Sequence, residues 1–329
     1  MSEKSYLLGF DIGGTKIGIG IGTADGKLLQ SERIDNINTN PDEVLPKLAE
    51  IALRQIREVG LSPRDIVAFG ISTPSPADIP NGIITTPPNN PYWRNVPIKK
   101  YLENALQIRG CFDNDANCAA LAEWYFGAGK GCRNMIYLTM STGIGAGIIA
   151  EGKLLQGKGF LAGEIGHSVL VPGGRLCNCG LRGCYEAYAG GRAIAQRMQE
   201  ELADQPDHPM LKYAKEGKLA NIDMLALELA ARDGVDYAVT LWDEMCKRDA
   251  QAYGMLMNIF NPEKIVLGTI AYAAGDFFME PVKKYLPEFA WQETLRDCQI
   301  VPSMLKREIG SYAGIAGALY ELRQKGILP

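Results

Sequence analysis

The fold of this chain is decided by a glycine-rich hairpin that occurs twice. In the first copy, residues 11–16 read Asp-Ile-Gly-Gly-Thr-Lys between two short apolar runs, and residues 24–29 follow as Ala-Asp-Gly-Lys-Leu-Leu. In the second copy, residues 141–145 read Ser-Thr-Gly-Ile-Gly, and residues 150–155 follow as Ala-Glu-Gly-Lys-Leu-Leu. An internal repeat predicts two similar domains. A cleft between domains is the usual place of a small-molecule site.

The turns of the two hairpins carry groups that bind phosphate. Glycines present backbone N–H groups, and Thr15 and Lys16 add side-chain donors, so the first turn suits phosphate oxygens. A strand rather than a helix follows the turn, which excludes the Walker and dinucleotide-binding spacings. The alternative is a tight hairpin whose glycines serve only the turn geometry. Two copies of the motif favour a nucleotide bound by two domains.

A second informative stretch, residues 163–191, contains a set of zinc ligands. One imidazole and three thiols lie close together in the sequence: His167, Cys177, Cys179 and Cys184. Nitrogen and sulfur ligands in this number form a complete tetrahedral zinc site without an open position, so we predict a structural ion. Gly180 and Gly183 allow the sharp turns that such a site needs. The alternative is a loop of unrelated thiols.

Three acidic residues are candidates for substrate chemistry. Glu164 and Glu186 flank the cysteine cluster and can accept hydrogen bonds from sugar hydroxyls, although two solvated surface acids are the alternative. Asp115 follows Asp113 and Asn114, either of which is a natural N-cap for a helix. In the first helical turn an acid either complements the helix dipole or serves as a general base.

The remaining elements follow from periodicity. Apolar spacing predicts helices over residues 41–60, 118–126, 186–202, 225–231, 237–259 and 310–323. Short apolar runs predict strands at 66–71 and 264–267, and Gly268 then provides a turn that can hold an adenosine. Loops at 72–78 and 85–97 are rich in proline, hydroxyl and amide groups, which suits either sugar binding or a rigid connector.

Composition indicates a soluble globular protein. The chain has 329 residues, a net charge of −4, 47% hydrophobic and 22% charged residues. This balance argues against a broad nucleic-acid footprint. We expect a cytoplasmic protein, because there is no apolar start typical of a signal peptide and no run near the ~20 apolar residues of a membrane span. We expect the five cysteines outside the cluster to be reduced thiols.

Taken together, these motifs resemble the ROK family of sugar kinases and repressors over nearly the whole chain, with bacterial ATP-dependent glucokinases as the nearest pattern. The zinc motif is the most specific mark. Residues 11–16 and 141–145 are similar to the family's two phosphate loops, and residues 114–117 are similar to its catalytic segment. The resemblance implies an α/β, ribonuclease-H-like actin-type ATPase fold. It also implies a small domain over 1–112, joined by a C-terminal helix at about 310–329, and a large domain over 113–309.

The resemblance also implies an activity and its residues. The expected reaction is transfer of the ATP γ-phosphoryl to the 6-hydroxyl of a hexose, first of all glucose, with Asp115 as the base and Mg²⁺ on the phosphates. Sugar-binding positions fall on Asn89, Asn114, Asp115, Glu164, His167 and Glu186. Nucleotide and magnesium positions fall on Asp11, Gly13, Gly14, Thr15, Lys16, Thr142, Gly143 and Gly268. We further expect a homodimer or homotetramer without nucleic-acid or membrane partners.

Four alternatives to a glucose kinase remain at this stage. A kinase for an N-acetylhexosamine or another hexose is open, because Ser75 replaces a glycine in the sugar loop. Ser141 and the segment after Gly268 also depart from the family's glycines. A non-catalytic sugar sensor is disfavoured by Asp115, and a polyphosphate-dependent kinase by the cysteine cluster. A repressor is disfavoured because no DNA-binding module precedes the first strand.

Overall fold

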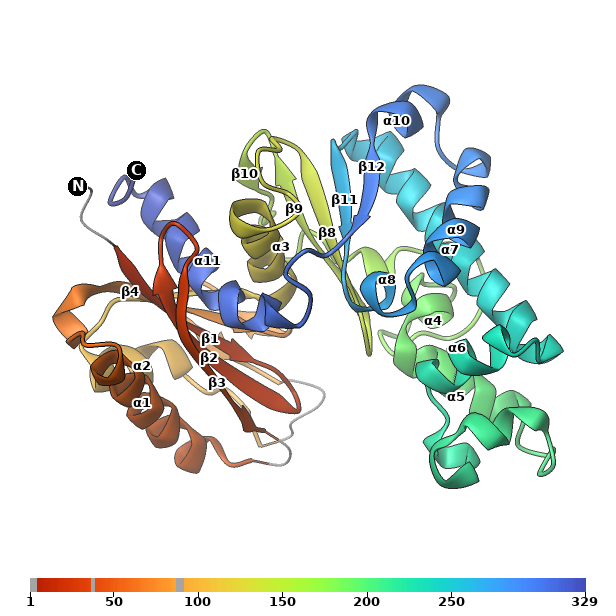
Figure 1. Cartoon of the computed structure of the whole chain (residues 1–329), viewed down its shortest axis with the longest axis horizontal. Helices are drawn as coiled ribbons and strands as arrows, with labels where there is room; N and C mark the ends of the chain where they lie inside the picture. Colours follow the sequence, from red (N-terminus) through yellow and green to blue (C-terminus); the bar gives the residue numbers. More distant parts are fainter. Residues whose placement is uncertain (1–4, 37–38, 87–91) are drawn as a thin grey trace. The chain divides into compact units, whose positions relative to one another are not determined.

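The computed structural model of this chain consists of two compact units and describes residues 5–36, 39–86 and 92–329 (Figure 1). The first unit comprises Met1–Gly131, Gln156–Phe160 and Met304–Pro329, and the second comprises Cys132–Leu155 and Leu161–Ser303. The first unit therefore extends beyond residue 112, which was the predicted end of the small domain. Part of the difference is helix α3 (Asp115–Phe126), which packs against the returning helix α11 (Ile309–Gln324) and so belongs to the first unit. Residues 156–160 and 304–309 also belong to the first unit rather than to the second.

The first unit is built on a five-stranded sheet in the order β3-β2-β1-β4-β7. Strands β1, β2 and β3 form an antiparallel meander, and β4 and β7 add in parallel on the other side of β1. The strands span Tyr6–Ile12, Lys16–Thr23, Leu28–Asp35, Ile66–Thr73 and Gly110–Asn114. A small hairpin of β5 (Ala77–Asp78) and β6 (Ile83–Ile84) lies apart from this sheet.

Strands β1, β2 and β4 are buried on both faces, which explains their continuous apolar runs, whereas β3 at the edge is partly exposed. Helices α1 (Pro41–Glu58) and α2 (Ile98–Leu106) pack with Leu8 and Phe10 on one face, while α11 packs with Leu7 on the other. Helix α11 approaches the sheet closely at Gly70, where a Cβ atom would clash with the carbonyl oxygen of Gly314. A larger residue at either position would push the helix off the sheet.

The second unit repeats the same sheet, in the order β10-β9-β8-β11-β12. Again three antiparallel strands are followed by two parallel ones, so the internal repeat predicted from the hairpins is confirmed. The strands in this order span Lys153–Leu154, Ile144–Ala150, Met135–Met140, Lys264–Leu267 and Gln299–Pro302. The helices α4 to α10 span Glu186–Ala189, Gly191–Glu201, Met224–Arg232, Asp236–Phe260, Thr269–Ala274, Asp276–Tyr285 and Gln292–Asp297.

One predicted helix is wrong in its continuity. The sequence predicted a single helix over 186–202, but α4 ends at Ala189 and α5 begins at Gly191. The break arises because the backbone N–H groups of Gly191 and Arg192 donate to the carbonyl oxygens of Ser141 and Thr142, at 2.9 and 3.0 Å. These bonds draw the start of α5 onto the second glycine turn. The glycine pair at the break gives up helix continuity at little steric cost.

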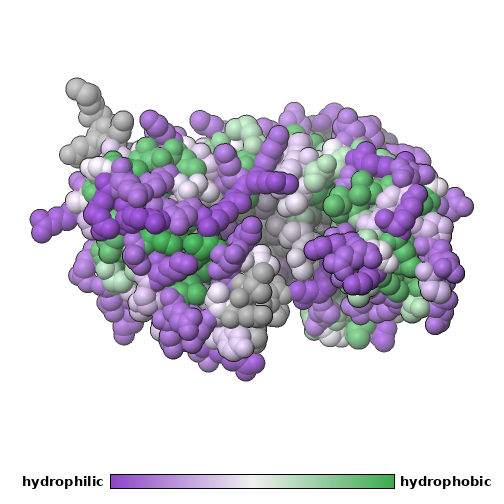
Figure 2. Space-filling view, turned by 60° about the horizontal axis from the view of Figure 1, so that its bottom comes forward, coloured by the Kyte–Doolittle hydropathy of each residue, from purple (hydrophilic) through white to green (hydrophobic). Residues whose placement is uncertain are grey.

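The surface in Figure 2 is mainly hydrophilic, as the proportions of charged and hydrophobic residues lead one to expect. Hydrophilic residues dominate the face drawn in Figure 2, and hydrophobic residues appear there in small areas. Within the described ranges, no helix combines the length and apolar character needed to cross a membrane.

Candidate functional site

The first glycine turn joins β1 to β2 and leaves its donors accessible. The N–H of Gly13 donates to the carbonyl oxygen of Lys16 at 2.9 Å, which closes the turn. The Asn36 side chain donates to the carbonyl oxygen of Gly13 at 2.6 Å and supports it from β3's end. Thr15 and Lys16 are exposed, so their side chains are free to meet a ligand. Gly14 is half-buried between them and Gly13.

Asp11 and the start of α3 lie at the same edge of the first sheet. Asp11 is paired with Ser72 in the ladder, and Ser72 with Asp113, so the carboxyl ends of β1, β4 and β7 are neighbours. Ser72 Oγ donates to Asp11 Oδ1 at 2.8 Å. Burial raises the pKa of Asp11 to about 6, against the opposing effects of the Ser72 hydrogen bond and the Arg33 charge. A ligand cation would restore the ionised form.

Asp115 is the first residue of α3 and is half-buried. Of the two residues predicted as possible N-caps, Asn114 is the one that caps α3. Its side-chain oxygen accepts from the N–H of Ala116 at 2.8 Å. Its amide nitrogen donates to Ser75 Oγ at 2.9 Å. The serine that departs from the family pattern therefore anchors the residue before Asp115. A carboxylate at a helix N-terminus is favoured in its charged form by the helix dipole.

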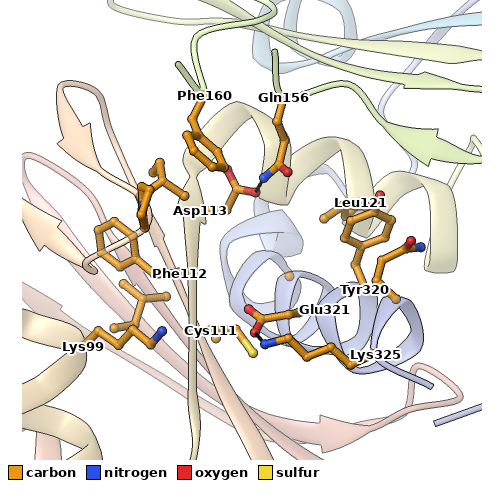
Figure 3. A pocket seen from close by; sticks show the side chains of 16 residues that line it. Lys99, Cys111, Phe112, Asp113, Leu121, Gln156, Phe160, Tyr320, Glu321 and Lys325 are labelled. Atoms are coloured by element: carbon orange, nitrogen blue, oxygen red, sulfur yellow. Dashed lines mark hydrogen bonds and ion pairs between the residues drawn. The ribbon is translucent and has the colours of Figure 1, made fainter. Parts of the chain in front are cut away.

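Asp113, the other residue predicted as a possible N-cap, does not cap α3 but accepts several hydrogen bonds beside its start. Its Oδ1 accepts from the Asn117 side chain at 2.8 Å and from the N–H of Asn114 at 2.7 Å. Its Oδ2 accepts from Gln156 Nε2 at 2.7 Å, the bond drawn in Figure 3. Burial raises the pKa of Asp113. The side chain borders a cavity of about 570 Å³ that Phe160 also lines. The sequence feature that could have pointed to Asp113 is its position as an acidic residue near the end of an apolar strand.

The second glycine turn, Ser141 to Gly143, joins β8 to β9 and is held by Glu186. The Glu186 Oε2 atom accepts from the N–H of Ile144 at 2.8 Å, and a Cβ atom at Gly143 would clash with this carboxylate. Glu186 was predicted as a sugar ligand from its position beside the cysteines. Its bond to the phosphate-type turn was missed, because the two segments are far apart in the sequence.

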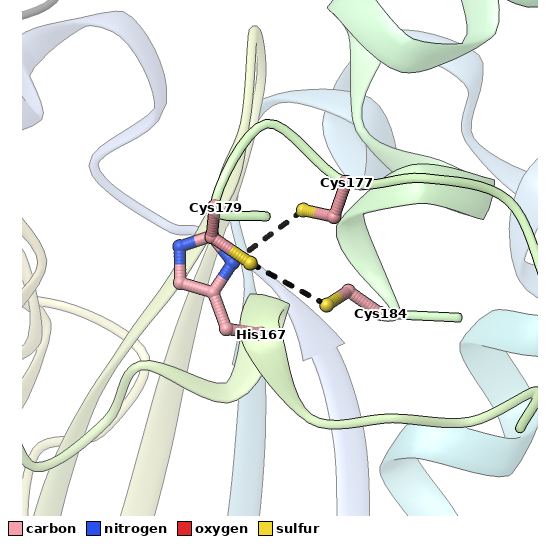
Figure 4. Close-up of side chains that lie close together, drawn as sticks. All are labelled: His167, Cys177, Cys179 and Cys184. Atoms are coloured by element: carbon pink, nitrogen blue, oxygen red, sulfur yellow. Dashed lines mark hydrogen bonds between the residues drawn. The ribbon is translucent and has the colours of Figure 1, made fainter. Parts of the chain in front are cut away.

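The four predicted zinc ligands are brought together in the second unit (Figure 4). His167 Nδ1 lies 3.7 Å from Cys177 Sγ, and Cys179 Sγ lies 3.7 Å from Cys184 Sγ. All four ligand atoms lie within 4.8 Å of one another. A tetrahedron with Zn–S bonds of about 2.3 Å has edges of about 3.8 Å, so the set fits a zinc ion. Gly180 and Gly183 have φ of 91° and 86°, as the predicted turns require.

The other predicted positions are more scattered. Glu164 is half-buried and precedes the short 3-10 helix Ile165–His167. Gly268 follows β11 and is the N-cap of α8. It donates its N–H to the carbonyl oxygen of Leu138 at 2.8 Å, so it lies beside the end of β8. Thr142 lies on the second turn, where its carbonyl oxygen accepts from Arg192. Asn89 lies outside the described residues.

Comparison with known proteins decides the family. The model of the ROK family matches residues 7–325. This chain belongs to the ROK family. It is 33% identical over 323 residues to a glucokinase of Thermotoga maritima, covering 98% of each chain.

Solved structures agree with this assignment. The ROK hexokinase from Thermus thermophilus shares 31% identity with this chain, with a TM-score of 0.83 and coverage of 98% of this chain and 99% of that one. A ROK family glucokinase from Streptomyces griseus, solved in complex with glucose and AMPPNP, shares 29% identity with a TM-score of 0.75 over 98% and 99%. The actin-type ATPase fold predicted from the sequence is confirmed by these relatives and by the duplicated sheets.

Proposed function

We propose that this protein is an ATP-dependent hexose kinase that transfers the γ-phosphoryl group of ATP to the 6-hydroxyl of glucose. The observation that carries the proposal is the edge of the first sheet, where the exposed glycine turn, Asp11 and Asp115 follow neighbouring strands. Phosphoryl transfer needs little beyond positioned donors, a metal ion and a base for the attacking hydroxyl. The relatives named glucokinase and hexokinase support the same reaction class.

In this proposal each group has one task. Asp115 accepts the proton of the sugar hydroxyl as it attacks, and Asn114 keeps Asp115 at the start of α3 through its cap. The N–H groups and the Thr15 hydroxyl of the first turn bind phosphate oxygens, as Thr142 and Gly143 do on the second. Asp11 holds Mg²⁺, which would neutralise phosphate charge when bound. Gly268 receives the adenosine.

Sugar recognition falls to the side chains around the zinc loop. Glu164 and Glu186 accept from sugar hydroxyls, and so does Asn89 by analogy with the family. We propose a structural zinc on His167 Nδ1 and the three cysteines, which leaves His167 Nε2 for the sugar. The ion would fix the loop from which these side chains project.

The test is a panel of hexoses and N-acetylhexosamines assayed for ATP-dependent ADP release. We expect glucose to give the highest kcat/KM, with the product identified as the 6-phosphate by NMR. The matched control is Asp115→Asn, which should lower turnover of every sugar that the wild type accepts by about 10²–10⁴-fold. Turnover of an N-acetylhexosamine without turnover of glucose would replace the substrate. Absence of ADP release with every sugar would overturn the kinase proposal.

A further inference from the structure

The chain passes between the two units at four places. These connections lie between Gly131 and Cys132, Leu155 and Gln156, Phe160 and Leu161, and Ser303 and Met304. Any movement of one unit relative to the other has to be absorbed in the backbone at these places. A side chain that binds a connection to an element of one unit therefore transmits such a movement to that element.

Glu123 on helix α3 binds the chain beside two of these connections. Its side chain is fully buried. Its Oε2 atom accepts from the N–H of Ala128 at 2.7 Å and of Met304 at 3.4 Å, and its Oε1 atom accepts from the N–H of Leu305 at 3.0 Å. One carboxylate thus joins the segment that leaves the first unit to the segment that returns. Gly127 is required beside it, because a Cβ atom there would clash with the Glu123 carboxylate.

Asp113, immediately before the cap of α3, binds a third connection. Gln156 is the first residue after that connection, and its amide donates to Asp113 Oδ2 at 2.7 Å. The segment Gln156–Phe160 ends at the one connection that neither carboxylate binds, between Phe160 and Leu161. Phe160 has φ 60° there, a conformation that is rare for a bulky residue. Figure 3 shows Phe160 beside Gln156 and Asp113, where it lines the cavity.

We propose that Glu123 and Asp113 are positioning residues for the kinase reaction. Glu123 fixes two of the four connections to α3, and Asp113 fixes a third to the end of β7, which runs directly into α3, so that movement at the connections reaches Asp115. Asp113 precedes Asp115 by two residues, and Glu123 follows it by eight, about 12 Å along the helix at 1.5 Å per residue. A packed helix moves as a rigid body over this length, so its two ends respond together. The proposal rests on the proposed function, because Asp115 is a general base only in that reaction.

A purely structural role for Glu123 is the competing explanation, and Glu123→Gln separates the two. The amide keeps the shape but replaces one acceptor oxygen by a donor, so either Leu305 or the Ala128 and Met304 pair loses its acceptor. We expect the amides of residues 128, 304 and 305 to exchange with solvent deuterium about tenfold faster or more. We also expect KM for the sugar to rise and kcat to fall, each by roughly tenfold, because α3 is held less firmly to the connections and Asp115 is aligned less well with the sugar.

The control for stability alone is Leu319→Ala, which opens a cavity in the α11 core of the same unit. This variant should lower Tm, while the sugar KM and the exchange of amides 128, 304 and 305 stay at wild-type values well below Tm. If Glu123→Gln behaves like Leu319→Ala in all three measurements, Glu123 is only a structural acid and the proposal fails for it.

The second variant, Gln156→Ala, removes a half-buried side chain and keeps the test decisive if Glu123→Gln does not fold. We expect a several-fold higher KM for the sugar and faster exchange at residues 156–160. The matched control is Gln324→Ala, an exposed glutamine that borders the same cavity from α11. Equal kinetics and exchange for the two alanine variants would overturn the anchoring by Asp113. Exchange is measured without substrates, so it decides the anchoring even if the wild type phosphorylates no sugar and the proposed function fails.

Discussion

The two glycine turns of this protein stand at corresponding places in corresponding sheets, yet they are supported differently. The first, between Ile12 and Lys16, is held by its own backbone and by the Asn36 amide. The second, between Met140 and Ile144, is held by the Glu186 carboxylate and by two N–H groups at the start of α5. The duplication preserved the backbone plan of the sheet, while the groups around each turn diverged.

The last strands of the two sheets differ more. Strand β7 runs directly into α3, so the first sheet ends in Asn114 and Asp115. Strand β12 ends at Pro302, and the chain then leaves the second unit after Ser303. The second unit instead carries the cluster of His167, Cys177, Cys179 and Cys184, which could hold a metal ion. Acid–base chemistry is thus expected from the first copy and substrate recognition from the second, and substitutions in each copy should separate the two tasks.

The largest effect is expected from Asp115→Asn in the first copy. A sugar hydroxyl is a poor nucleophile at neutral pH, and the amide keeps the shape of the side chain while removing its basicity. Loss of a general base typically lowers the rate about 10²–10⁴-fold. Sugar affinity should change by roughly tenfold at most, about 1.4 kcal/mol, because the other polar contacts remain. Steady-state rates beside calorimetric binding check both statements, and near-normal turnover would reduce Asp115 to a helix-terminal acid.

The second effect in size belongs to the zinc loop of the second copy. Purified protein should contain about one zinc per chain, and Cys179→Ala should lose it because three ligands form an incomplete site. We expect a lower Tm and weaker sugar binding, since His167 and Glu164 share the loop. Cys298→Ala, outside the cluster, serves as the control and should keep the metal. A stable and fully active Cys179→Ala protein without zinc would contradict the structural role.

Local sequence patterns predicted the parts of this molecule that depend on local chemistry. The repeated hairpins, the clustering of His167 with the three cysteines, and the Asn114 cap follow from spacing and residue type, and the structure shows each of them. Features set by distant contacts were not predictable. The bonds from Gly191 and Arg192 to the second turn divide a periodic helix, and packing of α3 on α11 moves the unit boundary. The tasks of Glu123 and Asp113 depend on partners remote in sequence.

The third effect tests the double task of Glu186. Glu186→Gln retains an oxygen that can accept from Ile144, so it should keep the second turn and weaken only sugar binding. Glu186→Ala should raise KM for both sugar and ATP, because the turn loses its support. A hydrogen bond to a charged group is worth about 1.5–3 kcal/mol, or roughly 10–150-fold in affinity. Asn36→Ala on the first turn is the counterpart and should raise KM for ATP alone.

If the two Glu186 variants raise KM for ATP equally, the carboxylate charge rather than the hydrogen bond to Ile144 supports nucleotide binding. Unchanged KM for sugar in both variants would remove Glu186 from the sugar site. The first result would change how the second turn is supported, and the second would leave Glu186 with the support of that turn as its only task.

The smallest effect concerns Asp11 and pH. Its pKa is raised from 3.8 to about 6 in the folded chain. The protonated form is therefore favoured by folding, so its contribution to stability is present below about pH 4 and is lost as pH rises through about 6. Asp11→Asn should consequently have a higher Tm than the wild type at pH 8, with the difference vanishing near pH 4. Calorimetry without nucleotide or Mg²⁺ measures it, and a Tm difference independent of pH would contradict the titration of Asp11.

The titration of Asp11 should also affect activity, and the hydrogen bond from Ser72 provides a test of this. The ionised carboxylate is the form that holds Mg²⁺, so kcat/KM should fall as pH drops through about 6. Ser72 Oγ donates to Asp11 Oδ1 at 2.8 Å and favours the ionised form. Removing this bond in Ser72→Ala should move the acidic limb of the pH profile upward by about one unit, since one unit corresponds to 1.36 kcal/mol, the strength of such a bond. Activity at pH 8 should be nearly normal, because Asp11 is then ionised in both proteins. An acidic limb that does not move would show that another group, Asp115 among them, controls the profile, and Asp11 would lose its proposed task as the magnesium ligand of the first copy.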